Sequence, residues 1–211
     1  MKIRLEFEKN IRYISHLELM KAIQKILKRT GLKIKYSQGY NPHIILSVAN
    51  PIPVGVCGKS EFADFELEND MDEAELLKLL TEASPVGFVP KKIYKECKKD
   101  FNSTYKAIYK IEVNSLKEDK IMEFFDADII EVEKKAKGKI KTINIKDYIY
   151  TYSFEKTQDG FFINCELACG TQKNLNPNLI KKALDDRNIN VESFLPVRLE
   201  VLDENNDDFR K

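Results

Sequence analysis

The sequence predicts an α+β protein with two similar halves. Segments in which polar and apolar residues alternate, as in half-buried strands, are interrupted by segments with apolar residues at helical spacing. In residues 1–97 the order is strand, helix, two or three strands, helix, strand, and a similar order follows residue 103 with one extra hairpin. This is the βαββαβ pattern of ferredoxin-like folds. We therefore expect two ferredoxin-like subdomains, each an antiparallel sheet covered by helices on one face.

The composition is that of a globular protein. The 211 residues are 43% hydrophobic and 33% charged, and the formal net charge is +1. Such a charge gives no global sign of a nucleic-acid or membrane partner, so any basic surface must be local. No apolar run approaches the ~20 residues of a membrane span. Residues 1–10 alternate and do not resemble a signal peptide. We expect a cytoplasmic protein that contacts no membrane.

The four cysteines are Cys57, Cys97, Cys165 and Cys169. Cys165 and Cys169 form a C-x3-C pair, but a radical SAM cluster would need a third cysteine where Gln172 stands. In a strand, residues four apart lie roughly 13 Å from each other, too far to share a metal. We expect buried structural thiols, no metal and no cofactor.

The first half opens with a strand over residues 2–8 and a helix that starts at Ser15. Glu18 stands three residues after Ser15, which gives the capping box of a helix start. Gly31 ends the helix. Its core-facing residues are Leu19, Met20, Ile23, Ile26 and Leu27. The remaining predicted elements are strands at 32–36, 44–48, 61–67 and 88–94, an extended proline segment at 50–55 and a helix at 72–82.

The second half follows a polar, turn-rich boundary at 97–103 and spans 104–203. The Asp-Gly step in Gln158-Asp159-Gly160 predicts a hairpin. Asn176 is expected to cap the last helix, with Pro177 at its first position. Residues 204–211 read as a polar tail that frays. The predicted elements are strands at 105–113, 128–134, 139–145, 148–155, 161–168 and 194–202, and helices at 116–125 and from 177.

One candidate binding surface lies on the first helix. Lys21, Lys25 and Lys28 are spaced four and three residues apart and share one face, with Arg29 beside them. They form either a solvated helix surface or one that faces phosphates. Ser15 is most simply the helix cap. His16, in the first turn, is expected to be neutral, because the positive end of the helix dipole disfavours a charged ring.

A second candidate is the stretch from Ser37 to His43, which combines turn residues with hydrogen-bonding side chains. Gln38 and Asn41 either bind a ligand or tie the turn. Tyr13, Tyr36 and Tyr40 either stack on bases or belong to the core. His16 and His43 are the only histidines of the sequence. They are the candidates for acid/base catalysis, or they fix the loop by hydrogen bonds.

These two stretches carry a resemblance to a known family. Ser15–Met20 (S-H-L-E-L-M), Tyr36–His43 (Y-S-Q-G-Y-N-P-H) and Pro51–Gly55 (P-I-P-V-G) closely resemble the motifs of the radical-SAM-linked family of uncharacterised bacterial proteins. Glu18 and Tyr40 stand where that family has aspartate and phenylalanine. The resemblance implies a radical SAM enzyme as a separate partner chain. Because this chain has no three-cysteine motif, it would serve as a recognition module.

Three functional hypotheses follow. The first is a non-catalytic module that binds or presents RNA to a radical SAM enzyme. The second is a metal-independent endoribonuclease that uses His16 and His43, since two ferredoxin-like units are similar to RAMP-type CRISPR endoribonucleases. The glycine-rich loop of those enzymes has no convincing counterpart here. The third is a protein-interaction scaffold. No nucleophile elbow or P-loop motif is present, so an accessory role is favoured over an enzyme.

Overall fold

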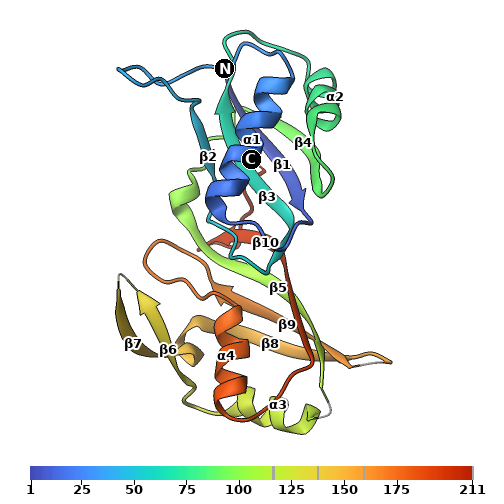
Figure 1. The fold of residues 1–211 in the computed structure, drawn as a ribbon, viewed down its shortest axis with the longest axis vertical. Helices are drawn as coiled ribbons and strands as arrows, with labels where there is room; N and C mark the ends of the chain where they lie inside the picture. The colour runs from blue at the N-terminus through green and yellow to red at the C-terminus, as the bar shows by residue number, and fades with distance from the viewer. Residues whose placement is uncertain (116, 137, 159, 211) are drawn as a thin grey trace. The chain divides into compact units, whose positions relative to one another are not determined.

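The computed structural model describes residues 1–115, 117–136, 138–158 and 160–210 (Figure 1). They form a mixed α/β protein with four α-helices, and the strand pairings of known register are antiparallel. The chain divides into two compact units. Unit 1 contains Met1–Thr104 and Glu200–Lys211, and unit 2 contains Tyr105–Leu199. The predicted positions Leu116, Asp159 and Lys211 lie outside the described residues.

Unit 1 is a sheet with two helices. Its strand order is β4-β1-β3, and the short β2 pairs with residues 63–65 of β3. β10 also neighbours β3, and its residues 200–203 belong to this unit. The elements are β1 (Lys2–Lys9), α1 (His16–Arg29), β2 (Leu46–Val48), β3 (Cys57–Glu66), α2 (Glu73–Ala83), β4 (Phe88–Lys95), the 3-10 helix η1 (Phe101–Ser103) and the end of β10 (Ser193–Asp203).

Helix α1 forms as its local sequence predicts. Ser15 accepts a hydrogen bond from the backbone N–H of Glu18, and the Glu18 carboxylate accepts one from the Ser15 N–H, which completes the capping box. Leu19, Ile23, Ile26 and Leu27 are buried, whereas Met20 is only partly buried. The helix therefore packs through one apolar side.

The two faces of the unit 1 sheet pack against different parts of the chain. Ile3, Leu5 and Phe7 of β1 share a core with the apolar sides of α1 and α2. On the opposite face, Phe62 packs with Phe209 from the C-terminal segment. The polar alternation of β1 therefore marks a second buried face rather than a solvent-facing one.

The predicted fraying of the C-terminal tail is wrong for the residues described. Phe209 is 0% exposed, and its ring lies 6.2 Å from that of Phe62 and 5.7 Å from that of Phe101. The backbone N–H of Asp203 donates to the Asp207 carbonyl oxygen, which turns the chain back. The buried ring of Phe209 anchors this polar segment on the sheet.

The predicted strand at 32–36 is also wrong. Only two isolated bridges form there, between Ile34 and Leu67 and between Tyr36 and Ile44. The predicted strand at 44–48 shortens to Leu46–Val48. The chain pairs with itself around residues 37–43 instead of extending the sheet, which leaves too few consecutive ladder bonds for a strand.

In unit 2 the strand order is β10-β5-β9-β8, and β6 and β7 form a separate two-stranded ribbon. Residues 193–199 of β10 belong to this unit. The elements are β5 (Thr104–Asn114), α3 (Glu118–Asp126), β6 (Glu131–Ala136), β7 (Lys139–Asn144), the 3-10 helix η2 (Ile145–Tyr148), β8 (Ile149–Lys156), β9 (Phe161–Ala168), α4 (Asn178–Asp186) and β10.

Helix α4 begins one residue later than predicted. Pro177 already has helical backbone angles, with φ −57° and ψ −25°, and the Asn176 side chain accepts a hydrogen bond from the Asn178 N–H. Asn176 therefore still satisfies one of the free donors at the helix start.

All four cysteines lie in the described ranges, and none of them forms a disulfide. Cys57, Cys165 and Cys169 are buried, as predicted, whereas Cys97 is only partly buried. Burial raises the pKa of the Cys165 thiol to about 12. This thiol therefore stays protonated at neutral pH and behaves as a small apolar core residue.

Candidate functional site

The solvent side of α1 is basic. Lys21, Lys25, Lys28 and Arg29 are exposed, while the opposite side of the helix is buried in the core. The only acidic residue of α1 is Glu18, which belongs to the capping box. The lysines of α4 differ, because Lys181 and Lys182 form ion pairs with Asp185 and Asp186 four residues on, at 2.7 and 3.2 Å. The α1 face therefore presents positive charge with little acidic compensation.

The same imbalance extends well beyond the helix. Residues 19–60 contain no aspartate or glutamate, although the whole chain has 34 acidic residues against 35 basic ones. Counting charge in windows along the sequence would have found this stretch, which the net charge of the chain conceals. Its basic residues are Lys21, Lys25, Lys28, Arg29, Lys33, Lys35 and Lys59.

Residues 36–44 form a projecting hairpin, which we call the arm. It is part of the blue loop that extends away from β2 in Figure 1. Tyr36 and Ile44 form an antiparallel bridge at its base. Next to the bridge, the Ser37 N–H donates to the His43 carbonyl oxygen at 2.7 Å, and the His43 N–H donates to Ser37 Oγ at 3.1 Å. Ser37 Oγ also lies 2.9 Å from His43 Nδ1. These bonds close the base of the arm, and His43 has the structural contact that was one of its two predicted roles.

The tip of the arm faces solvent. Tyr40 is 100% exposed, and Gln38, Asn41 and His43 are exposed as well. Gly39 has φ +135°, a backbone conformation that glycine adopts without strain. The amide side chains of the tip are therefore available to a partner.

The three candidate tyrosines all lie outside the core. Tyr13 is 80% exposed, Tyr36 is 45% exposed and Tyr40 is fully exposed. The alternative that these rings serve as core residues is therefore wrong. A large aromatic ring in water is a feature of contact surfaces.

The structure does not bring the two histidines together. Residues before α1 bond to the segment that precedes β3, where the Gly55 N–H donates to the Arg12 carbonyl oxygen at 2.7 Å. The base of the arm bonds to the other end of β3, where the Lys35 N–H donates to the Glu66 carbonyl oxygen at 2.8 Å. His16 and His43 thus lie near opposite ends of α1, a helix about 20 Å long. The arm therefore does not face the start of α1.

His16 is half-buried in the first turn of α1. Its Nδ1 atom is buried and has no hydrogen-bond partner within the described residues. Burial lowers the pKa of the imidazole from its ordinary value of 6.5, so the ring is neutral at pH 7. This agrees with the neutral ring expected at a helix start.

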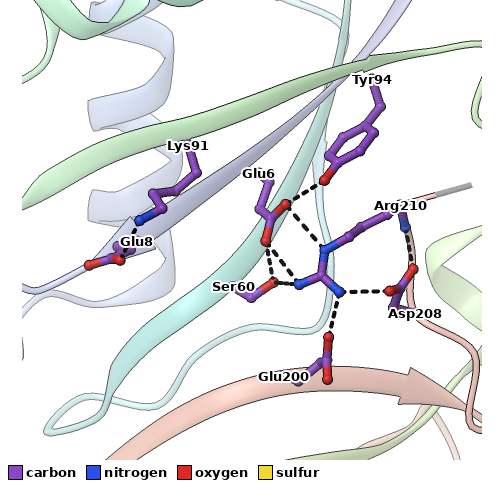
Figure 2. Close-up of polar contacts among 8 residues, drawn as sticks. All are labelled: Glu6, Glu8, Ser60, Lys91, Tyr94, Glu200, Asp208 and Arg210. Atoms are coloured by element: carbon purple, nitrogen blue, oxygen red, sulfur yellow. Dashed lines mark hydrogen bonds and ion pairs between the residues drawn. The ribbon is translucent and has the colours of Figure 1, made fainter.

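A partly buried polar cluster, missed in the sequence, holds the C-terminal segment in unit 1 (Figure 2). The guanidinium of Arg210 donates to the carboxylates of Glu6 at 3.0 Å, Glu200 at 2.5 Å and Asp208 at 2.6 Å. Ser60 and Tyr94 donate to Glu6 from neighbouring strands. These bonds connect residues up to 204 positions apart in the sequence.

The protonation states in this cluster follow from its contacts. Burial alone would raise the pKa of Glu6, but the hydrogen bonds from Arg210, Tyr94 and Ser60 outweigh it and lower that pKa. Burial and the bond to Glu6 together raise the pKa of the Tyr94 hydroxyl. Glu6 is therefore a carboxylate and Tyr94 a phenol at neutral pH, and the cluster works as a structural clamp.

A second buried pair lies on the same face. Arg4 is 1% exposed and binds Asp64 through two hydrogen bonds of 2.7 and 2.8 Å. Arg4 also donates to the carbonyl oxygens of Phe209 and Lys99, at 2.9 and 2.7 Å. The pair therefore fixes the backbone of the C-terminal segment.

The described ranges contain neither a candidate metal site nor a helix suited to span a membrane. Among residues 1–115, 117–136, 138–158 and 160–210, no three His, Cys, Asp or Glu side chains gather as metal ligands. None of the helices in these ranges has the length and apolar character needed to cross a membrane.

Comparisons with known proteins give a family and a distant likeness. The model of a family described as uncharacterised protein conserved in bacteria (DUF2344) matches residues 2–177. No curated protein matches significantly. A solved chain described as "Crystal Structure of a Cbf5-Nop10-Gar1 Complex" is similar, with 11% sequence identity and a TM-score of 0.49. The match covers 94% of this chain but 48% of that one, so this chain spans about half its length. At this TM-score the likeness carries no argument about function.

Proposed function

Because the chain belongs to this bacterial family of uncharacterised proteins, we propose its function from its surface. It is a non-catalytic module that binds RNA and presents it to a separate radical SAM enzyme. The observation that carries the proposal is the acid-free stretch at residues 19–60, which supplies both the basic face of α1 and the arm. A local basic surface on a chain of net charge +1 fits an anionic partner.

The α1 face has the properties of a phosphate-binding surface. Lys21, Lys25 and Lys28 project from one rigid helix, and Arg29 follows them. Long basic side chains in solvent reach phosphate oxygens at little desolvation cost, and such contacts supply most of the affinity for nucleic acid. Tyr36, Gln38, Tyr40 and Asn41 of the arm add contacts beyond the phosphates. Ser15 and His16 lie at the other end of α1 and border this surface.

The radical SAM partner is supported by the motifs at 15–20, 36–43 and 51–55. The described cysteines include no three-cysteine cluster, so radical chemistry would have to come from the partner chain. Co-purification with a radical SAM enzyme of the same bacterium tests this part separately. Both partners would be expected in the cytoplasm.

We propose further that each unit is a ferredoxin-like domain. In unit 1 the strand order β4-β1-β3, with β2 on β3, is that of an antiparallel βαββαβ sheet. In unit 2 the order β10-β5-β9-β8 is the same when its strands are numbered within the unit and the β6–β7 ribbon is left out.

Salt-dependent binding tests the RNA part. We expect the affinity for a short RNA to fall steeply with salt, with log K changing by about 0.7 per phosphate contact for each decade of salt. The variant K21Q/K25Q/K28Q/R29Q should bind more weakly and reduce this slope by about 2–3. The matched control K181Q/K182Q changes two partly exposed, ion-paired helical lysines of unit 2 and should leave the slope unchanged. Equal slopes for both variants would refute the proposal.

The two alternative functions give different results in the same experiment. An endoribonuclease would cleave the RNA and lose cleavage in the variant H16A. The distance between His16 and His43 disfavours a shared reaction centre, because general acid/base groups must reach the same reacting atoms. A scaffold would capture the radical SAM enzyme and bind no RNA.

A further inference from the structure

The side chain of Tyr40 is covered by none of the described residues. It lies at the tip of the arm with 100% exposure, while the bonds between Ser37 and His43 close the base. A ring held on a closed hairpin loses little conformational freedom when a flat partner stacks on it. The arm therefore presents one aromatic platform to the outside.

The neighbours of Tyr40 suit a nucleotide. Gln38 and Asn41 are exposed, and each carries an amide that both donates and accepts hydrogen bonds, as base edges do. Residues 30–35 connect the end of α1 to the base of the arm, and this segment contains Lys33 and Lys35 but no acidic residue. A stacking ring between amides and basic side chains is the combination that holds single-stranded nucleic acid.

The platform requires an unstacked base. In an RNA duplex each base face is covered by its neighbours, and the deep, narrow major groove of the A-form excludes side chains. We infer that the arm binds an unpaired nucleotide of the RNA by stacking its base on Tyr40, so that single strands and loops are the substrate class. This inference rests on the proposed RNA binding and adds which structural state of RNA is bound.

Binding to matched single-stranded and duplex RNA tests the inference. The probe is a 12-nucleotide RNA with one 2-aminopurine, alone or annealed to its complement, and the variants are Y40A and Y40F. We expect the protein to bind the single strand at least tenfold more tightly than the duplex. Y40A should weaken single-strand binding by about fivefold to 150-fold, the range for loss of one stacked base, and should abolish the quenching of 2-aminopurine. Y40F keeps the ring and should stay within about twofold of the original protein.

The control is V86A, which truncates a side chain that is 99% exposed and lies outside α1 and the arm, and it should leave binding and quenching unchanged. Equal binding of both RNAs with no effect of Y40A would overturn the inference and leave the proposed function standing. If neither RNA bound in a salt-dependent way, both would fail. If Y40A abolished capture of the radical SAM enzyme but not RNA binding, the arm would be assigned to protein contact and the inference would be wrong.

Discussion

Truncation of Phe209 tests whether the C-terminal segment is an integral part of unit 1. In the variant F209A a fully buried ring is lost from the packing with Phe62 and Phe101. The hydrogen bond from Arg4 ends on the backbone oxygen of Phe209 and survives the change, so the variant isolates the ring. A buried Phe→Ala change costs about 3–5 kcal/mol of unfolding free energy.

Urea unfolding measures this loss. With a denaturant slope of about 2 kcal/mol per molar, the unfolding midpoint of unit 1 should fall by about 2 M. Hydrogen exchange in peptides from β1 and β3 assigns the transition to unit 1, because two units need not unfold together. The control V86A changes a side chain that is 99% exposed and should stay within about 0.5 kcal/mol of the original. A midpoint shift for F209A no larger than that of V86A would refute the assignment of this segment to the core.

Two further predictions concern an ion pair and a glycine of unit 1. Hydrogen bonding from Lys91 is the main cause that lowers the pKa of Glu8 to about 2 (Figure 2). The stability that the ionised Glu8 contributes to the fold is therefore fully present at a pH above the ordinary pKa of 4.5, and it is lost as the pH falls through about 2. Carboxyl NMR titration should find this midpoint, and K91M should move it towards 4.5; an unmoved midpoint would contradict the assigned cause. Gly87 has φ +88°, and a Cβ there would lie 2.5 Å from Cγ1 of Ile11. The variant G87A should lose at least about 1 kcal/mol more in thermal unfolding than G31A, because Gly31 also has positive φ (+70°) but open space around it. Equal losses of stability in G87A and G31A would contradict this prediction and show that the Ile11 side chain moves aside without cost.

The elements that the sequence predicts well are those with local causes. The capping box at Ser15 and the helical spacing of the apolar side chains define α1 within fifteen residues. Such signals need no knowledge of the rest of the chain. The short pairing at the arm was mistaken for a strand, because bridges and ladders have the same local alternation of side chains.

The buried polar face of unit 1 could not be predicted in the same way. Alternation in β1 shows that Arg4 and Glu6 share a face, but not what covers that face. They are 1% and 9% exposed because residues about 200 positions later return to them. Neither the spacing of residues nor the composition predicts which segment covers this face, because Phe209 is one aromatic residue within a polar segment.

The residues of the candidate site could be predicted from the sequence, but their positions relative to one another could not. Lys21, Lys25 and Lys28 share a face, as helix geometry requires, and they are exposed. The separation of His16 and His43 depends on the path of the chain after α1, which returns along the far end of β3. Motifs that lie close in a sequence can therefore belong to opposite ends of one helix.

Unit 1 is assembled from both ends of the described chain, with residues 105–199 between its two parts. On the ribosome, the strands that contain Arg4 and Phe62 emerge well before the segment that covers them. At ordinary rates of synthesis, about 5–20 residues per second, the intervening residues take roughly 5–20 s to translate. During that interval the nascent sheet exposes an apolar and charged face that residues 200–210 cover once they are translated, and we expect this exposed face to bind chaperones during synthesis.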